Sequence, residues 1–341
     1  MPIPVLVECI RGGTVESRHR GSLAIAHADS GILLSIGATD TPVFPRSSVK
    51  LVQALALVES GAADRFGFSD YELALACASH AGEPRHVETA LGILDRVGLD
   101  IGALACGPHW PARPELVAAM GASGIEPTRA HNNCSGKHSG MLAFAVHAGL
   151  DPAGYERRDH PVQQRIGGIM TDVFLTDMGD VPCGVDGCSL PTLGVSLSAL
   201  ARGFARLTGD AAIAVERRAA ADRLMRACMS QPHAVGGVGK FDTEVMQAFG
   251  GRVFTKIGAE GVHVVVFPHL KIAAAVKIDD GAARASEVVA AAIVARFAVE
   301  SAEDDSAIAA RVCPPLHNAA GIEVGRLQPV AALVNALATF G

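Results

Sequence analysis

The chain is poor in charged side chains and has no long apolar run, and both shortages limit what the protein can do. Charged residues make up 19% of the 341 residues and the net charge is -6, so no sustained basic patch is available to bind nucleic acid. The apolar runs at 262–268 and 272–276 are interrupted by lysines and are far shorter than the ~20 residues that cross a bilayer. We therefore expect no nucleic-acid partner and no membrane span.

The start of the sequence does not have the pattern expected of an export signal. The first apolar stretch contains Glu8 and Arg11, and it lacks both a basic start and a small-residue cleavage site. This pattern predicts a cytoplasmic protein. The eight cysteines are accordingly expected to be reduced thiols, most of them small core residues, rather than a disulfide framework.

Lysine is scarce in a chain that otherwise relies on arginine for positive charge. The 29 basic residues include only these lysines: Lys50, Lys137, Lys240, Lys256, Lys271 and Lys277. Arginine cannot give up its proton, whereas lysine can. A lysine in this sequence therefore favours chemistry that needs a compact or titratable amine.

The pattern of apolar residues predicts strands at both ends of the chain and helices between them. Length and apolar content allow either one large domain or two that share an interface. Predicted strands lie at 5–9, 15–18, 23–28, 32–36, 252–256, 262–267 and 272–278, and predicted helices at 47–58, 70–79, 85–97, 114–120, 136–148, 161–174, 196–207, 211–228 and 282–299. This order predicts an α+β fold with a largely antiparallel sheet.

A Ser-x-x-Lys motif begins the first predicted helix. Ser47 and Lys50 are three residues apart, so hydroxyl and amine share one helical face. The positive end of the helix dipole, burial and a second nearby cation would favour an uncharged Lys50, which could then deprotonate Ser47. Chance produces such a motif in roughly one of three chains of this composition, so a coincidental match stays open at this point.

Further elements of the same kind follow in the chain. Ser79 at a helix end and Lys256-Ile257-Gly258 on a late strand occur in the order found with Ser-x-x-Lys in penicillin-recognising enzymes. This agreement favours a serine nucleophile over a coincidental motif.

The glycine-rich segment 235–240 superficially resembles a phosphate-binding loop. Ala234 stands where that motif needs its first glycine, and Phe241 replaces its serine or threonine. We therefore interpret the segment as a flexible loop and expect no nucleotide site.

Two further segments, 131–138 and 183–188, are dense in polar groups. Cys134, Cys188 and the neighbouring imidazole and carboxylate groups could bind zinc, but neither segment has the paired Cys-x-x-Cys spacing of a structural zinc site. A buried hydrogen-bonded loop, with Cys134 capping a helix and Cys183 in the core, is the alternative. Spacing alone leaves both interpretations open.

Taken together, these motifs resemble those of the Rhizobium-type L-asparaginases. The resemblance rests on Arg46-Ser47 with Lys50, on Ser79-His80-Ala81-Gly82-Glu83, on the segments 131–138 and 183–188, on Lys256-Ile257-Gly258-Ala259-Glu260-Gly261, and on the N-terminal segment 15–21. It spans nearly the whole chain.

The resemblance implies a serine β-lactamase/glutaminase-like α+β fold, formed as a single domain over 1–341 with its helical region at about 47–230, and a homodimer. It also implies two Ser-Lys pairs, Ser47 with Lys50 and Ser79 with Lys256. A zinc ion would be held by Cys134, Lys137 and Cys188, with Lys137 uncharged. The resemblance does not say whether the metal acts in catalysis.

These expectations define a hypothesis of L-asparagine hydrolysis. Ser47 would attack the side-chain amide while Lys50 takes its proton, and Ser79 and Lys256 would relay it. Asp186 and Arg46 are candidates for binding the substrate's α-ammonium and α-carboxylate, and His138 is a further substrate-binding candidate. A β-lactam or ester hydrolase and a zinc-bearing binding protein without activity are the alternatives, and glutamine is not excluded as a substrate.

Overall fold

The computed structural model describes residues 3–340, and these form two compact units. The first unit contains the residues up to Ser48, the stretch Val195–Asp210 and the residues from Ala248 onward. The second contains Val49–Gly194 and Ala211–Gln247. The chain thus passes between the units several times, and a single domain over 1–341 stays a prediction.

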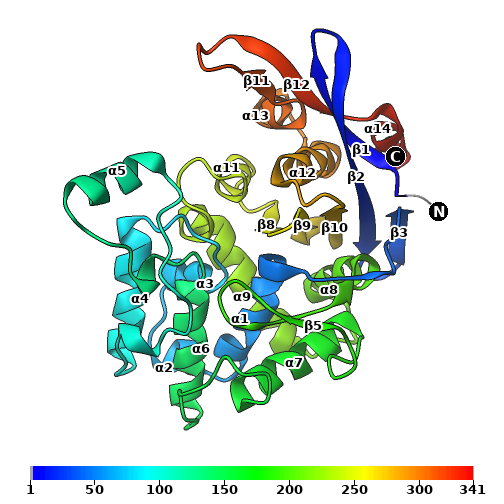
Figure 1. Ribbon diagram of the computed structural model, residues 1–341. Coiled ribbons are helices and arrows are strands. Elements are labelled where there is room, and N and C mark those ends of the chain that lie inside the picture. Colours follow the sequence, from blue (N-terminus) through cyan, green and yellow to red (C-terminus); the bar gives the residue numbers. More distant parts are fainter. Residues whose placement is uncertain (1–2, 341) are drawn as a thin grey trace. The chain divides into compact units, whose positions relative to one another are not determined.

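The first unit is built on an antiparallel sheet that joins the two ends of the chain (Figure 1). The strand order is β11-β12-β1-β2-β10-β9-β8, and β3 also pairs with β2. The strands are β1 (Val5–Arg11), β2 (Thr14–His27), β3 (Gly31–Ile36), β8 (Phe254–Gly258), β9 (Val262–Phe267), β10 (Ile272–Ile278), β11 (Pro315–His317) and β12 (Glu323–Pro329). This confirms the predicted α+β class with a largely antiparallel sheet.

Strand β2 is longer than the sequence pattern predicts. Two short strands were expected on either side of Gly21, but β2 continues through it, and Gly21 pairs with Ile278 of β10. A Cβ atom on Gly21 would lie 2.6 Å from the Lys277 carbonyl oxygen. Glycine is therefore needed here for the close approach of two strands, not for a turn.

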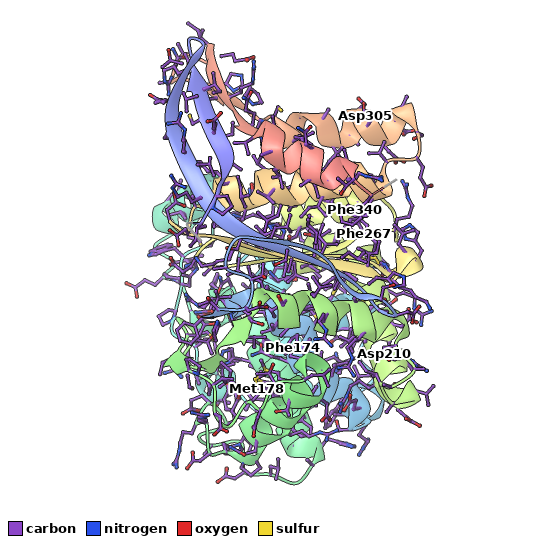
Figure 2. The ribbon with its side chains drawn as sticks, turned by 90° about the vertical axis from the view of Figure 1, so that its right-hand side faces the viewer. Phe174, Met178, Asp210, Phe267, Asp305 and Phe340 are labelled. Atoms are coloured by element: carbon purple, nitrogen blue, oxygen red, sulfur yellow. The ribbon has the colours of Figure 1, made fainter. Side chains whose placement is uncertain are left out.

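Helices cover both faces of the central strands. Helix α8 (Leu197–Gly209) packs on β2 and β10, and helix α12 (Ala283–Ala298) packs on β9 and β10 from the opposite face (Figure 2). Residues 21–26 of β2 are consequently all buried instead of alternating between buried and exposed. The core of this unit lies on both sides of the sheet.

The chain after residue 299 forms elements for which the sequence pattern made no prediction. They are α13 (Ala302–Val312), β11, β12 and α14 (Ala331–Ala338). Strand β12 pairs with β1 from the other end of the chain, with Val7 opposite Pro329. Its sequence is mostly polar and has no clear alternation, so a local pattern could not identify it.

The second unit is helical and is organised around α1 (Lys50–Glu59), whose first eight residues are all buried. Helix α1 contacts α6, α7 and α9. The other helices are α2 (Ala62–Arg65), α3 (Asp70–Ala76), α4 (Pro84–Arg96), α5 (Pro114–Ala122), α6 (Ser135–His147), α7 (Pro161–Phe174), α9 (Val215–Ser230), α10 (Pro232–Val235) and α11 (Phe241–Ala248). No helix within residues 3–340 combines the length and apolarity required of a membrane span.

Two helix boundaries that matter for the site differ from expectation. The predicted helix 47–58 begins as a 3-10 turn, η1 (Arg46–Val49), before α1. Helix α3 ends at Ala76, so Ser79 lies in the loop beyond it and not at the helix end.

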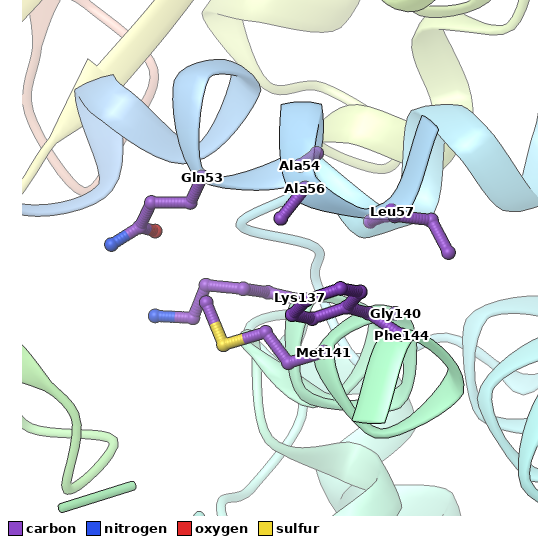
Figure 3. A pocket seen from close by; sticks show the side chains of 9 residues that line it. Gln53, Ala54, Ala56, Leu57, Lys137, Gly140, Met141 and Phe144 are labelled. Atoms are coloured by element: carbon purple, nitrogen blue, oxygen red, sulfur yellow. The ribbon is translucent and has the colours of Figure 1, made fainter. Parts of the chain in front are cut away.

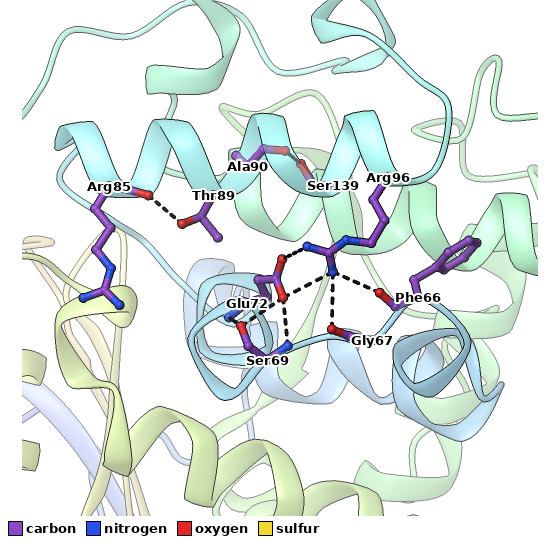
Figure 4. Close-up of polar contacts among 9 residues, drawn as sticks. All are labelled: Phe66, Gly67, Ser69, Glu72, Arg85, Thr89, Ala90, Arg96 and Ser139. Atoms are coloured by element: carbon purple, nitrogen blue, oxygen red, sulfur yellow. Dashed lines mark hydrogen bonds and ion pairs between the residues drawn. The ribbon is translucent and has the colours of Figure 1, made fainter.

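A polar network holds α3 against α4 (Figure 4). Ser69 caps α3, its backbone N–H donating to the Glu72 carboxylate at 2.8 Å. Arg96 of α4 donates to both oxygens of that carboxylate and to the Phe66 carbonyl oxygen at 3.0 Å. Burial opposes ionisation of Glu72, but the bonds from Arg96 and Ser69 prevail and lower its pKa. The network therefore fixes the helix that leads to Ser79.

Candidate active site

Lys50 is the first residue of α1 and is fully buried. Its amine donates to the Ser79 hydroxyl at 3.0 Å, to the Cys134 sulfur at 3.1 Å and to the Ala78 carbonyl oxygen. The Lys50 amine thus has three hydrogen-bond partners, all from residues distant in the chain. The structure thus shows a hydrogen bond between Lys50 and Ser79. The resemblance had instead paired Ser79 with Lys256. That Lys50 is uncharged stays a prediction.

Cys134, Lys137 and Cys188 lie together, as the resemblance implied. All three are buried, and the Lys137 amine donates to the Cys188 sulfur at 3.1 Å. A hydrogen bond from Cys188, with the charges of Lys50 and Lys137, holds the pKa of the Cys134 thiol well below its ordinary value. That same bond to Cys134, together with burial, raises the pKa of Cys188. The positive charges of Lys50 and Lys137 therefore favour a thiolate in this pair.

Lys137 lies in a strongly electronegative environment. Burial alone would lower its pKa, but the two cysteine sulfurs and Asp186 outweigh burial and raise it. Coordination of a metal by Lys137 would require its ammonium group to lose one proton and become an uncharged amine. Two sulfurs and one nitrogen are the donor types that Zn²⁺ prefers, so the chemistry of this group suits zinc. Among residues 3–340 no cluster of three or more His, Cys, Asp or Glu side chains could hold a metal, so any such site depends on the lysine.

Asp186 and Cys188 are placed by a small hairpin of β5 (Cys183–Val185) and β6 (Pro191–Leu193). Asp186 is half-buried, and its carboxylate accepts a bond from the Gly187 N–H at 2.7 Å. The Asp186 N–H donates to the Leu190 carbonyl oxygen at 2.8 Å. The hairpin thus presents Asp186 near the lysine and cysteine group; its role in substrate binding stays a prediction.

His138 is fully buried beside this group. Its Nδ1 is hydrogen-bonded to the Tyr155 hydroxyl, which also accepts a bond from the Ala105 N–H at 3.0 Å. Burial, then the charges of Lys137 and Lys50, lower the pKa of His138 well below its ordinary value, so the ring is neutral. Its Nε2 has no partner among the described residues.

Gln53 is a polar neighbour of Lys137 that the sequence analysis missed. It lies one turn after Lys50 on α1, and its buried side-chain oxygen has no partner among residues 3–340. Gln53 and Lys137 line a cavity of about 10 Å³, room for roughly one water molecule. Figure 3 shows the Gln53 amide and the Lys137 amine at the same end of this cavity.

Ser47 belongs to the first unit and lies in the turn η1, at the end of that unit's N-terminal stretch. Arg46, immediately before it, has a φ of 53°, a left-handed conformation that is strained for a residue with a side chain. Ser48 closes the turn, its hydroxyl donating to the Pro45 carbonyl oxygen at 2.8 Å. Such strain next to a proposed nucleophile is a feature that only coordinates can reveal.

Strand β8 of the same unit packs closely on this turn. A Cβ atom on Gly258 would lie 2.6 Å from the Pro45 carbonyl oxygen and 3.2 Å from the Ser48 nitrogen. Lys256, two residues earlier on the strand, is fully buried and donates to the Ile257 carbonyl oxygen at 2.8 Å. The glycine of Lys-x-Gly therefore allows β8 to support the segment that carries Ser47.

The predicted site residues thus form two groups. The second unit brings together Lys50, Ser79, Cys134, Lys137, His138, Asp186 and Cys188, and the first unit holds Arg46, Ser47 and Lys256. The roles assigned to these residues stay predictions.

The chain is similar to several solved structures and matches the model of one protein family. Similar solved structures include a β-lactamase from Mycobacterium bovis (13% identity, 88% of this chain and 97% of that chain covered, TM-score 0.39). They also include a D-alanine carboxypeptidase from Burkholderia cenocepacia (12% identity, 86% and 92% covered, TM-score 0.37). At these scores the similarities carry no argument about function, and no curated protein matches the chain. The model of the L-asparaginase II family, however, matches residues 7–329, and the protein therefore belongs to this family of asparaginase-type amidohydrolases.

Proposed function

We propose that the protein hydrolyses L-asparagine to L-aspartate and ammonia through a serine nucleophile activated by a lysine. The observation that carries the proposal is the buried Lys50 amine, which lies 3.0 Å from the Ser79 hydroxyl and follows Ser47 by one turn of the chain. A buried amine in hydrogen-bond contact with a hydroxyl is the arrangement needed to move a proton from serine.

In the proposed reaction, the Ser47 oxygen attacks the side-chain amide carbon and its proton passes to Lys50. The carbon–nitrogen bond then breaks, and the departing nitrogen takes the proton and leaves as ammonia. Water cleaves the resulting β-aspartyl ester, restoring the Ser47 hydroxyl. Ser79 and Lys256 relay the proton. Electrostatic complementarity assigns Asp186 to the substrate's α-ammonium and Arg46 to its α-carboxylate. His138 is a further substrate-binding candidate.

We also propose that Cys134, Lys137 and Cys188 hold zinc. The donor set and its burial support this. When bound, zinc would supply Lewis-acid polarisation of a carbonyl group or would hold the β5–β6 hairpin to α6. Metal analysis of Cys188→Ala, beside the exposed-cysteine control Cys313→Ala, tests the assignment independently of activity, and equal zinc content in both would contradict it.

We further propose that the protein is a homodimer in the cytoplasm. Analytical ultracentrifugation tests the dimer.

The decisive experiment measures ammonia release from asparagine by wild type, Ser47→Ala, Ser79→Ala and the control Ser306→Ala, which changes an exposed serine on α13. We expect loss of turnover in Ser47→Ala and a slowed reaction in Ser79→Ala. Peptide mass spectrometry of the enzyme quenched during turnover locates the ester. An ester on Ser79 would reverse the roles of the two serines, and full activity of Ser47→Ala would exclude Ser47 as the nucleophile.

Two parallel assays address the alternatives. A chromogenic β-lactam tests the β-lactam hydrolase, and zinc bound without ammonia release would favour a binding protein. Glutamine is longer than asparagine by one methylene, worth only ~1–3 kcal/mol of discrimination in a pocket, so we expect measurable but slower release of ammonia from glutamine.

A further inference from the structure

The Glu83 carboxylate connects two distant segments beside Ser79. Glu83 is 6% exposed, and one carboxylate oxygen is 2.8 Å from His233 Nε2. The other oxygen accepts a bond from the Val238 N–H at 3.0 Å. These partners lie 150 and 155 residues away along the chain, at either end of the segment 233–238, which contains much of the glycine-rich stretch. One carboxylate therefore holds both ends of this segment.

Two more hydrogen bonds join the same segments. The Ser79 N–H donates to the Val235 carbonyl oxygen at 3.0 Å. His86 Nδ1 accepts a bond from the Glu83 N–H at 3.1 Å, so its Nε2 carries the proton that is donated to the His233 carbonyl oxygen at 2.9 Å. Through Val235, any displacement of the segment 233–238 acts directly on the backbone of Ser79.

The contact between the segments leaves no room for a side chain at its centre. Gly237 has a φ of 97°, and a Cβ atom there would lie 2.7 Å from the Ala81 Cβ and 2.9 Å from a Glu83 carboxylate oxygen. Glycine is required here both for the backbone conformation and for the approach. Gly237, in the stretch that superficially resembles a phosphate-binding loop, therefore serves packing against 79–83.

We propose that Glu83 is a positioning residue for the amidohydrolase reaction: its carboxylate clamps the segment 233–238 against 79–83 and so holds the Ser79 hydroxyl beside the Lys50 amine. The proposal rests on the proposed function, in which Ser79 and Lys50 move the serine proton. Proton transfer requires heavy atoms within hydrogen-bond reach, and a displacement of about 1 Å can cost about 100-fold in rate. The clamp acts on the very residue whose separation from Lys50 is 3.0 Å.

Charge and hydrogen bonding at Glu83 are separable by substitution. In Glu83→Gln the amide oxygen can still accept from the Val238 N–H, and the amide nitrogen can donate to His233 Nε2 once His233 carries its proton on Nδ1, next to the Tyr71 hydroxyl at 2.9 Å. Glu83→Ala loses both contacts. Glu88, which is exposed on α4, provides matched controls as Glu88→Gln and Glu88→Ala.

The test combines steady-state ammonia release with amide hydrogen exchange on the full chain. For Glu83→Ala we expect kcat to fall about 10- to 100-fold with KM within about threefold, and faster exchange of the Ser79 and Val238 amides. Glu83→Gln should recover kcat to within about threefold of wild type, and both Glu88 variants should match wild type. If Glu83→Ala does not fold, His233→Ala, which leaves the Val238 bond in place, should show a smaller fall in kcat with KM unchanged.

Three results would overturn the clamp. The first is a wild-type kcat in folded Glu83→Ala or His233→Ala. The second is an equal fall in kcat in Glu83→Gln and Glu83→Ala. The third is faster hydrogen exchange of the Val238 amide in Glu83→Ala while exchange of the Ser79 amide is unchanged. Failure of the proposed function is distinguishable, because it would show as no ammonia release by the wild type. In that case the exchange of the Ser79 amide still reports whether Glu83 holds this segment.

Discussion

Substitution of Gly258 by alanine tests how strand β8 supports the proposed nucleophile. The backbone of Gly258 is not in the left-handed region, so alanine is permitted by conformation, but its methyl group would lie 2.6 Å from the Pro45 carbonyl oxygen. The turn or the strand must move by about 0.8 Å to reach the 3.4 Å of an ordinary contact. That displacement falls on the turn that carries Ser47.

The size of the effect follows from this displacement. A shift approaching 1 Å costs up to about 100-fold in rate, and overpacking costs about 1–3 kcal/mol of stability. We therefore expect Gly258→Ala to lower kcat for asparagine about 10- to 100-fold while KM changes little, and to lower the free energy of unfolding by about 1–3 kcal/mol. Steady-state ammonia release and urea unfolding measure the two quantities.

Gly92→Ala is the matched control, since nothing lies within 4 Å of the added Cβ and Gly92 sits within helix α4. It should retain wild-type kcat and gain about 0.5–1 kcal/mol of stability. The reasoning fails if Gly258→Ala is as active as wild type, because the turn would then tolerate displacement or Ser47 would not be the nucleophile.

Two further predictions concern stability and pH. Burial lowers the pKa of His86 from 6.5 to about 4, so the unfolded chain binds a proton at a higher pH than the folded protein does. The free energy of unfolding should therefore fall by as much as about 3 kcal/mol between pH 6.5 and pH 4. Urea unfolding of His86→Gln should show a weaker dependence on pH over this range. The Glu72 carboxylate, whose pKa is lowered from 4.5, contributes stability above pH 4.5 that is lost as pH falls through its folded pKa. Glu72→Gln should therefore lower the melting temperature at pH 7 more than at pH 3, and an equal loss at both would remove the ion pair with Arg96 as its cause.

Most of the fold followed from local patterns in the sequence. Helices such as α7 and α12 and strands such as β9 and β10 carry clear periodicity, and their predicted ranges agree with the structure within a few residues. The break expected at Gly21 was wrong because glycine served an approach between strands, which sequence cannot separate from a turn. Strand β12 was missed because its pairing with β1 comes from the far end of the chain.

The candidate site was also only partly predictable. Lysine scarcity and motif spacing led to Lys50, whereas the family resemblance led to Lys137 with Cys134 and Cys188. The structure places these residues together in the second unit. Glu83 ends the motif 79–83 that carries part of the family resemblance, but the sequence assigned it no role. No sequence pattern pointed to His233. No local pattern connects these two residues, because the contact depends on the packing of segments 150 residues apart.

The sequence by itself determined which chemistry the chain can carry. It supplies serines, titratable amines and thiols, and some of them are three residues apart, a spacing at which side chains are neighbours on a helix. The tertiary structure alone decided which of these groups meet. Lys50 donates to Ser79 and Cys134, which are 29 and 84 residues away along the chain. A buried charged or polar group is costly without a partner, and only the packing of the whole chain decides which partner it meets.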